Sequence, residues 1–148
     1  MASTTFSGPV TSTNGFIGAL TGNIAGTGSI THTPTAINAT ATATAAQVAT
    51  GYITSTSAAA VSITLPTGTL LGAALGATQG TVFDLYIDNT AGATAVTVLV
   101  ATNGIKSDAA ATTAASFGQS TVAFGATGIG RFTIMFSSAT AYVFTRTA

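Results

Sequence analysis

The sequence predicts a mainly β fold, a β-sandwich or a partly closed β-barrel with one or two short helices and an extended N-terminal arm. Short segments of alternating apolar and polar residues recur from Tyr52 onward, roughly 8–12 residues apart, which is typical of sandwiches and barrels. Glycine, asparagine and proline separate these segments. Most aromatic and aliphatic residues also lie in this part of the chain, so we expect the core there.

The clearest strand pattern covers residues 61–65, where Val61, Ile63 and Leu65 share one face and Pro66 ends the alternation. The pair Asn103-Gly104 is typical of a hairpin turn. Alternation also predicts that Asp84, Tyr86 and Asp88 point away from the core, as do Arg131, Thr133 and Met135. Further strands are predicted over 52–56, 81–88, 95–101, 110–117, 121–124, 131–137 and 140–146.

Two short helices interrupt the strand pattern. Thr44 can cap a helix over 45–49, and Gly51 can end it in the left-handed conformation. Thr67 or Thr69 can cap a second helix before Gly76. We expect that second helix to bury one face made of Leu70, Leu71, Ala74 and Leu75.

The last two predicted strands allow a test of register. If Ser137 pairs with Thr140, Ile134 faces Val143 and Arg131 faces Arg146. Two cations directly opposite each other are unfavourable. We therefore expect Asp84 or Asp88 to lie beside one of these arginines, within about 6 Å, the distance over which an opposite charge acts strongly.

Residues 1–43 are predicted to be an arm and residues 44–148 the β domain. Glycines punctuate the first segment, and its apolar residues follow no regular period. Such a segment is either a disordered tail or an arm that becomes ordered on a partner. Widely spaced apolar anchors favour the second interpretation, and the candidate partner-binding residues are Phe6, Pro9, Val10, Phe16 and Ile17.

The run of alternating threonine and alanine over 40–44 raises the hypothesis of an ice-binding threonine array. Such an array needs the triplet to return at a fixed period. No fixed return is found, so a short extended linker is the preferred interpretation.

The composition excludes several classes of function. Only 4% of the residues are charged, the net charge is zero, and no charged residue precedes Asp84. Nucleic-acid binding needs a basic surface, and most enzymes need several carboxylates or imidazoles close together. His32 has no carboxylate near it in sequence, so a plain polar contact is expected. We therefore expect that the protein is not an enzyme, that it has no cofactor and no metal site, and that it binds neither nucleic acid nor a membrane.

An almost uncharged surface favours association, because net charge is what keeps soluble proteins apart. We therefore expect neighbouring protein subunits to cover much of this chain.

The residues also resemble a known family. The opening Thr4-Thr5-Phe6-Ser7-Gly8-Pro9-Val10, followed by Ser12-Thr13-Asn14-Gly15-Phe16, is similar to that of small structural proteins of tailed bacteriophages. Leu65-Pro66-Thr67-Gly68 and the run from Gly80 to Thr90 resemble the β domains of phage head decoration (cement) proteins.

The resemblance implies a homotrimer, made in the bacterial host cytoplasm, that sits on the outer surface of the phage head. Such a virion protein would bind the major capsid protein and stabilise the contacts between its subunits. The alternative is a phage fibre, tail or host-attachment binding module. Glycan sites of that class commonly contain tryptophan, and this chain has none.

Overall fold

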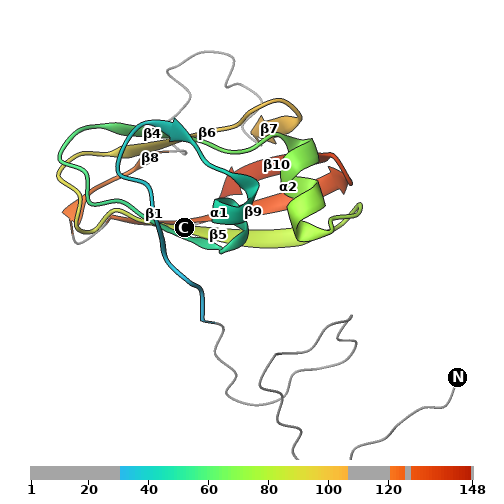
Figure 1. Ribbon diagram of the computed structural model, residues 1–148, viewed down its shortest axis with the longest axis horizontal. Coiled ribbons are helices and arrows are strands. Elements are labelled where there is room, and N and C mark those ends of the chain that lie inside the picture. The colour runs from blue at the N-terminus through green and yellow to red at the C-terminus, as the bar shows by residue number, and fades with distance from the viewer. Residues whose placement is uncertain (1–30, 107–120, 126–127, 148) are drawn as a thin grey trace, which may run out of the picture. The chain divides into compact units, whose positions relative to one another are not determined.

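The computed structural model describes residues 31–106, 121–125 and 128–147. These residues form two sheets and two short helices (Figure 1). The expected mainly β fold is confirmed, and no closed barrel forms in the described part of the chain. Side chains of both sheets, among them Ile53 and Ile63, share one buried core, so the arrangement is a sandwich.

The six-stranded sheet has the order β1 (Thr35–Ala36), β3 (Tyr52–Thr54), β5 (Val82–Asp88), β9 (Ile129–Ser138), β10 (Ala141–Arg146) and β7 (Gly104–Lys106). The four-stranded sheet has the order β2 (Ala41–Thr42), β4 (Val61–Thr64), β6 (Val96–Leu99) and β8 (Thr121–Val122). All the expected strands overlap observed ones except that over 110–117, which lies outside the described residues. The alternation does not predict β7.

The first six strands alternate between the two sheets. Strands β1, β3 and β5 pair in parallel in one sheet, and β2, β4 and β6 pair in parallel in the other. Two neighbouring parallel strands must be joined by a long connection. Here each of these connections includes a strand of the opposite sheet. The chain therefore winds as a coil whose successive turns stack edge to edge, and the antiparallel strands β8, β9 and β10 complete the sheets.

The coil begins earlier than the sequence predicts. Strands β1 and β2 lie within the range assigned to the arm, yet they pair with β3 and β4. Ile37 and Ala43 are buried, with 6% and 2% of their surface exposed. Residues 35–43 therefore belong to the folded body, and 40–44 is not a mere linker. These residues contain little apolar surface of their own, and neighbouring strands provide the burial.

Both helices follow strands of the four-stranded sheet: α1 (Ala45–Ala49) and α2 (Gly68–Leu75). The Thr44 hydroxyl accepts a hydrogen bond from the Gln47 amide at 3.2 Å, and the Gln47 side chain accepts one from the Thr44 amide at 2.8 Å. This capping box satisfies two amides at the start of α1. Thr67 caps α2. Gly51 and Gly76, with φ of 76° and 58°, follow the helix ends, so the predicted caps and stops are confirmed.

The predicted buried face of α2 is half correct. Leu71 is buried and Leu75 packs partly buried against the core, whereas Leu70 is 59% exposed and Ala74 is also exposed. The helix buries Gly68 and Gly72 in addition. A Cβ on Gly72 would overlap the carbonyl oxygen of Ala139, in the turn between β9 and β10. A Cβ on Gly68 would overlap the next carbonyl of that turn. The two glycines thus let the helix backbone lie directly against the hairpin. This contact involves backbone atoms, so the pattern of apolar side chains does not predict it.

The hairpin of β9 and β10 differs by one residue from the expected register. Phe144 faces Ile134, and Val143 faces Met135. The hairpin closes with Ala141 opposite Ser138, and a register shift between Ala141 and Tyr142 then passes over Ser137. In this register Tyr142 and Phe144 of β10 point inward. A slip of one residue would have turned both side chains to solvent. Two ring contacts result within the core: Phe132 with Phe144 at 4.9 Å between centroids, and Phe136 with Tyr142 at 5.8 Å.

A turn forms at Asn103, whose φ is 63°, but it does not join a hairpin. Strand β6 belongs to the four-stranded sheet, and β7 pairs in parallel with β10 in the other sheet. Gly104 lies against the Tyr142 ring, and a Cβ there would overlap the phenol. The expected hairpin at this turn is therefore wrong, because the residues after it pair with the last strand of the chain.

The glycine contact of α2 predicts the effect of Gly72→Ala. The added methyl group meets the Ala139 carbonyl, so we expect the free energy of unfolding to fall by about 2 kcal/mol. Helix propensity alone would raise it by about 1 kcal/mol. Urea denaturation measures the change, and Ala74→Gly, at an exposed position of the same helix, measures propensity without the clash. A Gly72→Ala variant that is more stable than the parent would contradict the close approach.

Tyr142 predicts a loss of stability at high pH. Its buried hydroxyl donates to the Pro66 carbonyl at 3.1 Å, and burial raises its pKa to about 12. A folded pKa above the unfolded value of 10.0 gives stability that is complete below pH 10 and lost as the pH rises toward 12. We expect Tyr142→Phe to cost about 1 kcal/mol at neutral pH and to weaken this alkaline loss. Urea midpoints across this pH range test it, and an unchanged alkaline loss would refute the assignment.

Candidate functional site

The five candidate partner-binding residues, Phe6, Pro9, Val10, Phe16 and Ile17, lie outside the described residues. The described surfaces are those of the β-sandwich. Three of them differ in chemistry: the outer face of each sheet and a pocket beside the two helices.

The outer face of the six-stranded sheet is formed by the outward residues of β5 and β9. Leu85, Ile87, Phe132 and Ile134 are fully buried, so the residues that alternate with them point outward. The predicted outward orientation of both sets is confirmed. The outward residues are Val82, Asp84, Tyr86 and Asp88 on β5, and Ile129, Arg131, Thr133 and Met135 on β9.

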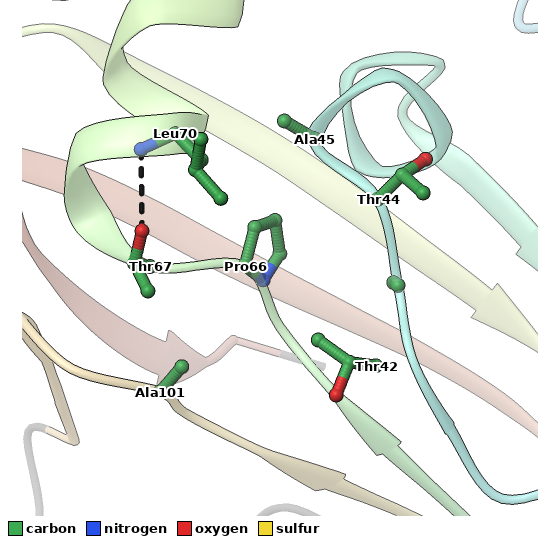
Figure 2. A pocket seen from close by; sticks show the side chains of 8 residues that line it. Thr42, Thr44, Ala45, Pro66, Thr67, Leu70 and Ala101 are labelled. Atoms are coloured by element: carbon green, nitrogen blue, oxygen red, sulfur yellow. Dashed lines mark hydrogen bonds between the residues drawn. The ribbon is translucent and has the colours of Figure 1, made fainter.

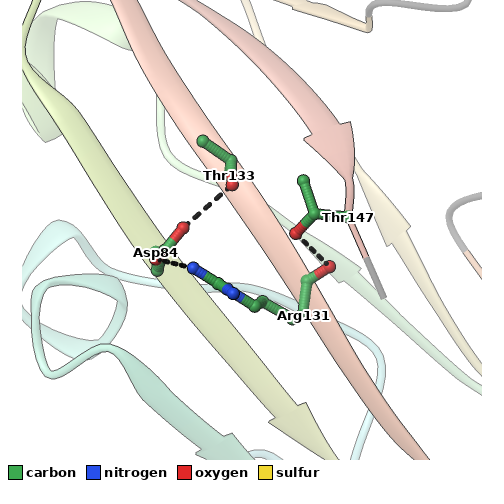
Figure 3. A network of polar contacts seen from close by, with 4 residues as sticks. All are labelled: Asp84, Arg131, Thr133 and Thr147. Carbon is green, nitrogen blue, oxygen red and sulfur yellow. Dashed lines mark hydrogen bonds and ion pairs between the residues drawn. The ribbon is translucent and has the colours of Figure 1, made fainter.

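An ion pair occupies the middle of this face (Figure 3). The Arg131 guanidinium donates to one oxygen of Asp84 at 2.6 Å, and the Thr133 hydroxyl donates to the other at 2.9 Å. The hydrogen bond from Arg131 is the main cause that lowers the pKa of Asp84, and the same contact raises the pKa of Arg131. The expectation of an Asp beside one of the arginines is confirmed, although Arg131 faces Tyr86 on β5 rather than Arg146.

A second carboxylate is held at the end of β5. Asp88 accepts hydrogen bonds from the Tyr52 hydroxyl at 2.7 Å and from the hydroxyl and amide of Thr90 at 2.7 and 2.9 Å. The bonds from Thr90 are the leading causes that lower the pKa of Asp88. The contact with Asp88 in turn raises the pKa of Tyr52. Both oxygens of each described carboxylate on this face therefore already accept hydrogen bonds from the chain itself.

His32 and Tyr86 extend the polar surface toward β3. The His32 ring centroid lies 5.9 Å from that of Tyr86, and its Nδ1 atom is 2.9 Å from the Thr50 carbonyl oxygen. On β9, the Arg131 guanidinium lies 5.9 Å from the Tyr86 ring. The imidazole therefore makes the plain polar contact that was expected.

Arg146 joins the two sheets. It donates to the Thr121 carbonyl on β8 at 2.6 Å, and its guanidinium lies 5.9 Å from the Phe132 ring. The cation thus connects the last strand of the six-stranded sheet to an edge of the four-stranded one, which gives it a structural role.

The outer face of the four-stranded sheet has a different composition. Ile63, Val96 and Val98 point into the core, so the residues between them point outward. The strand pairing places these residues in adjacent rows. They carry hydroxyl or aliphatic groups and no ionisable group: Thr42, Ser62, Thr64, Thr97, Leu99 and Thr121.

A pocket of about 420 Å³ opens beside the starts of α1 and α2 (Figure 2). None of the described residues that line it is ionisable, and the exposed Leu70 forms part of its wall. Such a pocket can take an apolar side chain. It is lined by Thr42, Ala43, Thr44, Ala45, Pro66, Thr67, Leu70 and Ala101. These residues come from three separate segments, so no local sequence pattern predicts the pocket.

Within the described residues, no three His, Cys, Asp or Glu side chains gather as a metal site requires. Neither described helix is long and apolar enough to cross a membrane. Comparison with protein-family models, curated proteins and solved structures finds no match for this chain.

The ion pair predicts an acid-dependent effect of Asp84→Asn. Because the pKa of Asp84 is lowered on folding, its stabilisation is present above the unfolded value of 3.8 and is lost as the pH falls through the lower folded value. The pair is partly exposed, so the loss at neutral pH should be small. Urea midpoints of variant and parent should differ at about pH 7 and converge near pH 2. A difference that persists in acid would show that the ion pair is not its source.

Proposed function

We propose that this chain is a structural virion protein of a tailed bacteriophage, a decoration (cement) protein that binds the outer surface of the head. It would stabilise the contacts between major capsid protein subunits. The resemblance in sequence suggests this role. The main structural support is the uncharged outer face of the four-stranded sheet, with Thr64 and Thr97 near its centre.

An uncharged face of hydroxyl and methyl groups suits a contact with another protein surface. Burying this face leaves no charge unpaired. It therefore avoids the large free-energy penalty of taking an unpaired charge out of water. The serine and threonine hydroxyls can donate and accept hydrogen bonds with backbone groups of a partner. The sandwich beneath provides a rigid support, because Ile63 and Val98 are fully buried.

Packaged DNA pushes the shell outward, and a protein that holds several capsid subunits at once resists their separation. In the proposed homotrimer, three linked contacts would bind about 10²–10⁴-fold more tightly than one. The N-terminal segment would add apolar anchors to each contact. Its candidates remain Phe6, Pro9, Val10, Phe16 and Ile17.

The alternative of a fibre, tail or host-attachment module receives some support from the outer face of the six-stranded sheet. Two tyrosines, Tyr52 and Tyr86, lie there beside Asp88 and Arg131. However, the carboxylate oxygens on this face already accept hydrogen bonds from their own chain, which leaves fewer acceptors for sugar hydroxyls. Binding of the isolated full chain to a glycan array would favour the alternative.

The proposal predicts the effect of a double variant, Phe6→Ser with Phe16→Ser, on binding to undecorated phage heads. We expect at least a tenfold loss of affinity, because two apolar anchors are removed. Co-sedimentation with heads measures binding, and the urea midpoint of each variant, measured beside it, separates a loss of binding from a loss of folding. Thr5→Ser with Thr11→Ser is the matched control. If the parent does not bind heads, the proposed function is wrong. If the parent binds and the double variant binds with the same affinity, the arm's role is wrong.

A further inference from the structure

The exposed apolar residues of the described chain are concentrated on one surface. Of the five large hydrophobic side chains that are exposed there, three lie on the outer face of the six-stranded sheet: Val82, Ile129 and Met135. They are 60%, 51% and 49% exposed, and Val82 and Met135 are directly paired across β5 and β9. Neighbouring exposed apolar side chains rimmed by polar ones are typical of a protein contact.

The order of the outward residues along β9 indicates what kind of partner fits. Ile129 and Met135 lie at the two ends, and Arg131 and Thr133 lie between them. The order is apolar, polar, polar, apolar from either end. An interface about a two-fold axis brings the same patch of both copies together, so it requires a pattern that matches its own reverse.

We propose that this face is a contact between two copies of the chain, related by a two-fold axis that passes close to Phe132 of β9. The two β9 strands then run antiparallel across the interface. Ile129 of each copy meets Met135 of the other, and Arg131 of each copy meets Thr133 of the other.

The charges on the face fit this arrangement. Thr133 already donates to Asp84, so the arginine that meets Thr133 from the second copy also comes beside that carboxylate. Each Asp84 then lies between two guanidiniums, its own and that of the second copy, and each Arg131 lies between two carboxylates. Opposite charges alternate across the axis. The same axis brings Asp88, which is level with Ile129, opposite Val82 of the other copy, and Asp88 keeps its hydrogen bonds from Tyr52 and Thr90.

The small area of the face limits the affinity of the contact. The outward positions from 129 to 135 span about 20 Å along β9, and neighbouring strands are about 4.8 Å apart. The part formed by β5, β9 and β10 is therefore smaller than the interface of a tight dimer, and the contact should be weak and reversible. A weak contact becomes effective where many copies are held side by side.

The absence of cysteine from the chain allows a direct test in the full-length protein. Two single variants, Ile129→Cys and Met135→Cys, are mixed and treated with a bismaleimide that spans about 10 Å, the separation of packed sheets. We expect cross-linked dimers in the mixture and several-fold fewer with either variant alone, because the axis separates like positions and brings unlike ones together. Equal yields in all three samples, or no cross-linking, would overturn the proposed axis.

Sedimentation of the cysteine-free chain up to about 1 mM provides the second measurement. We expect association into species with an even number of copies, weakened at least tenfold by Met135→Lys. Leu70→Lys is the matched control, since Leu70 is at least as exposed as Met135 but lies on α2, and it should have no effect. A monomer at all concentrations, or a trimer that does not pair further, would overturn the inference.

This inference does not rest on the proposed function. Binding of Met135→Lys to phage heads with the parent's affinity, together with loss of pairing, would support the contact and leave the decoration role intact. If the parent pairs but does not bind heads, the proposed function alone fails. In a head-bound trimer, the same contact would join neighbouring trimers.

Discussion

Four aromatic side chains of the β9–β10 hairpin fill the space between the two sheets, and the rest of the fold depends on the register that points them there. Phe132, Phe136, Tyr142 and Phe144 are at most 3% exposed. The register also places Ala139 in a turn that the glycines of α2 can approach. It places the Tyr142 hydroxyl within reach of Pro66, at the end of β4. One strand pairing thus sets the sheet, the helix contact and the link between the layers.

The constraint also separates the surfaces. Alternation along β9 turns Phe132 inward, so Arg131 and Thr133 must face solvent, where Asp84 of β5 meets both. On the opposite sheet, β4 and β6 pair in parallel, which aligns hydroxyl-bearing residues such as Ser62 and Thr97. One outer face therefore carries paired charges and tyrosines, whereas the described residues of the other include no ionisable group.

The sequence predicts what depends on neighbouring residues. The Thr44 cap, the Gly51 stop and the alternation around Ile63 are local signals, and the structure has all three. The coil was beyond prediction, because its turns differ in length and contain no fixed repeat. The buried face of α2 was predicted only in part, since Gly72 makes its contact through backbone. The register of the hairpin depends on a shift between Ala141 and Tyr142, and the pocket depends on segments that only the fold brings together.

The unequal turns of the coil have a consequence for engineering. Helix α2 is fixed by the contact of its glycines with the turn between β9 and β10. Residues inserted into α2 would collide with the backbone of that turn. The connection from β3 to β4 carries no such contact in the described chain, and Ala58, Ala59 and Ala60 are exposed. A foreign peptide inserted between Ala59 and Ala60 would project from the molecule without disturbing the core, which makes this loop suitable for antigen display.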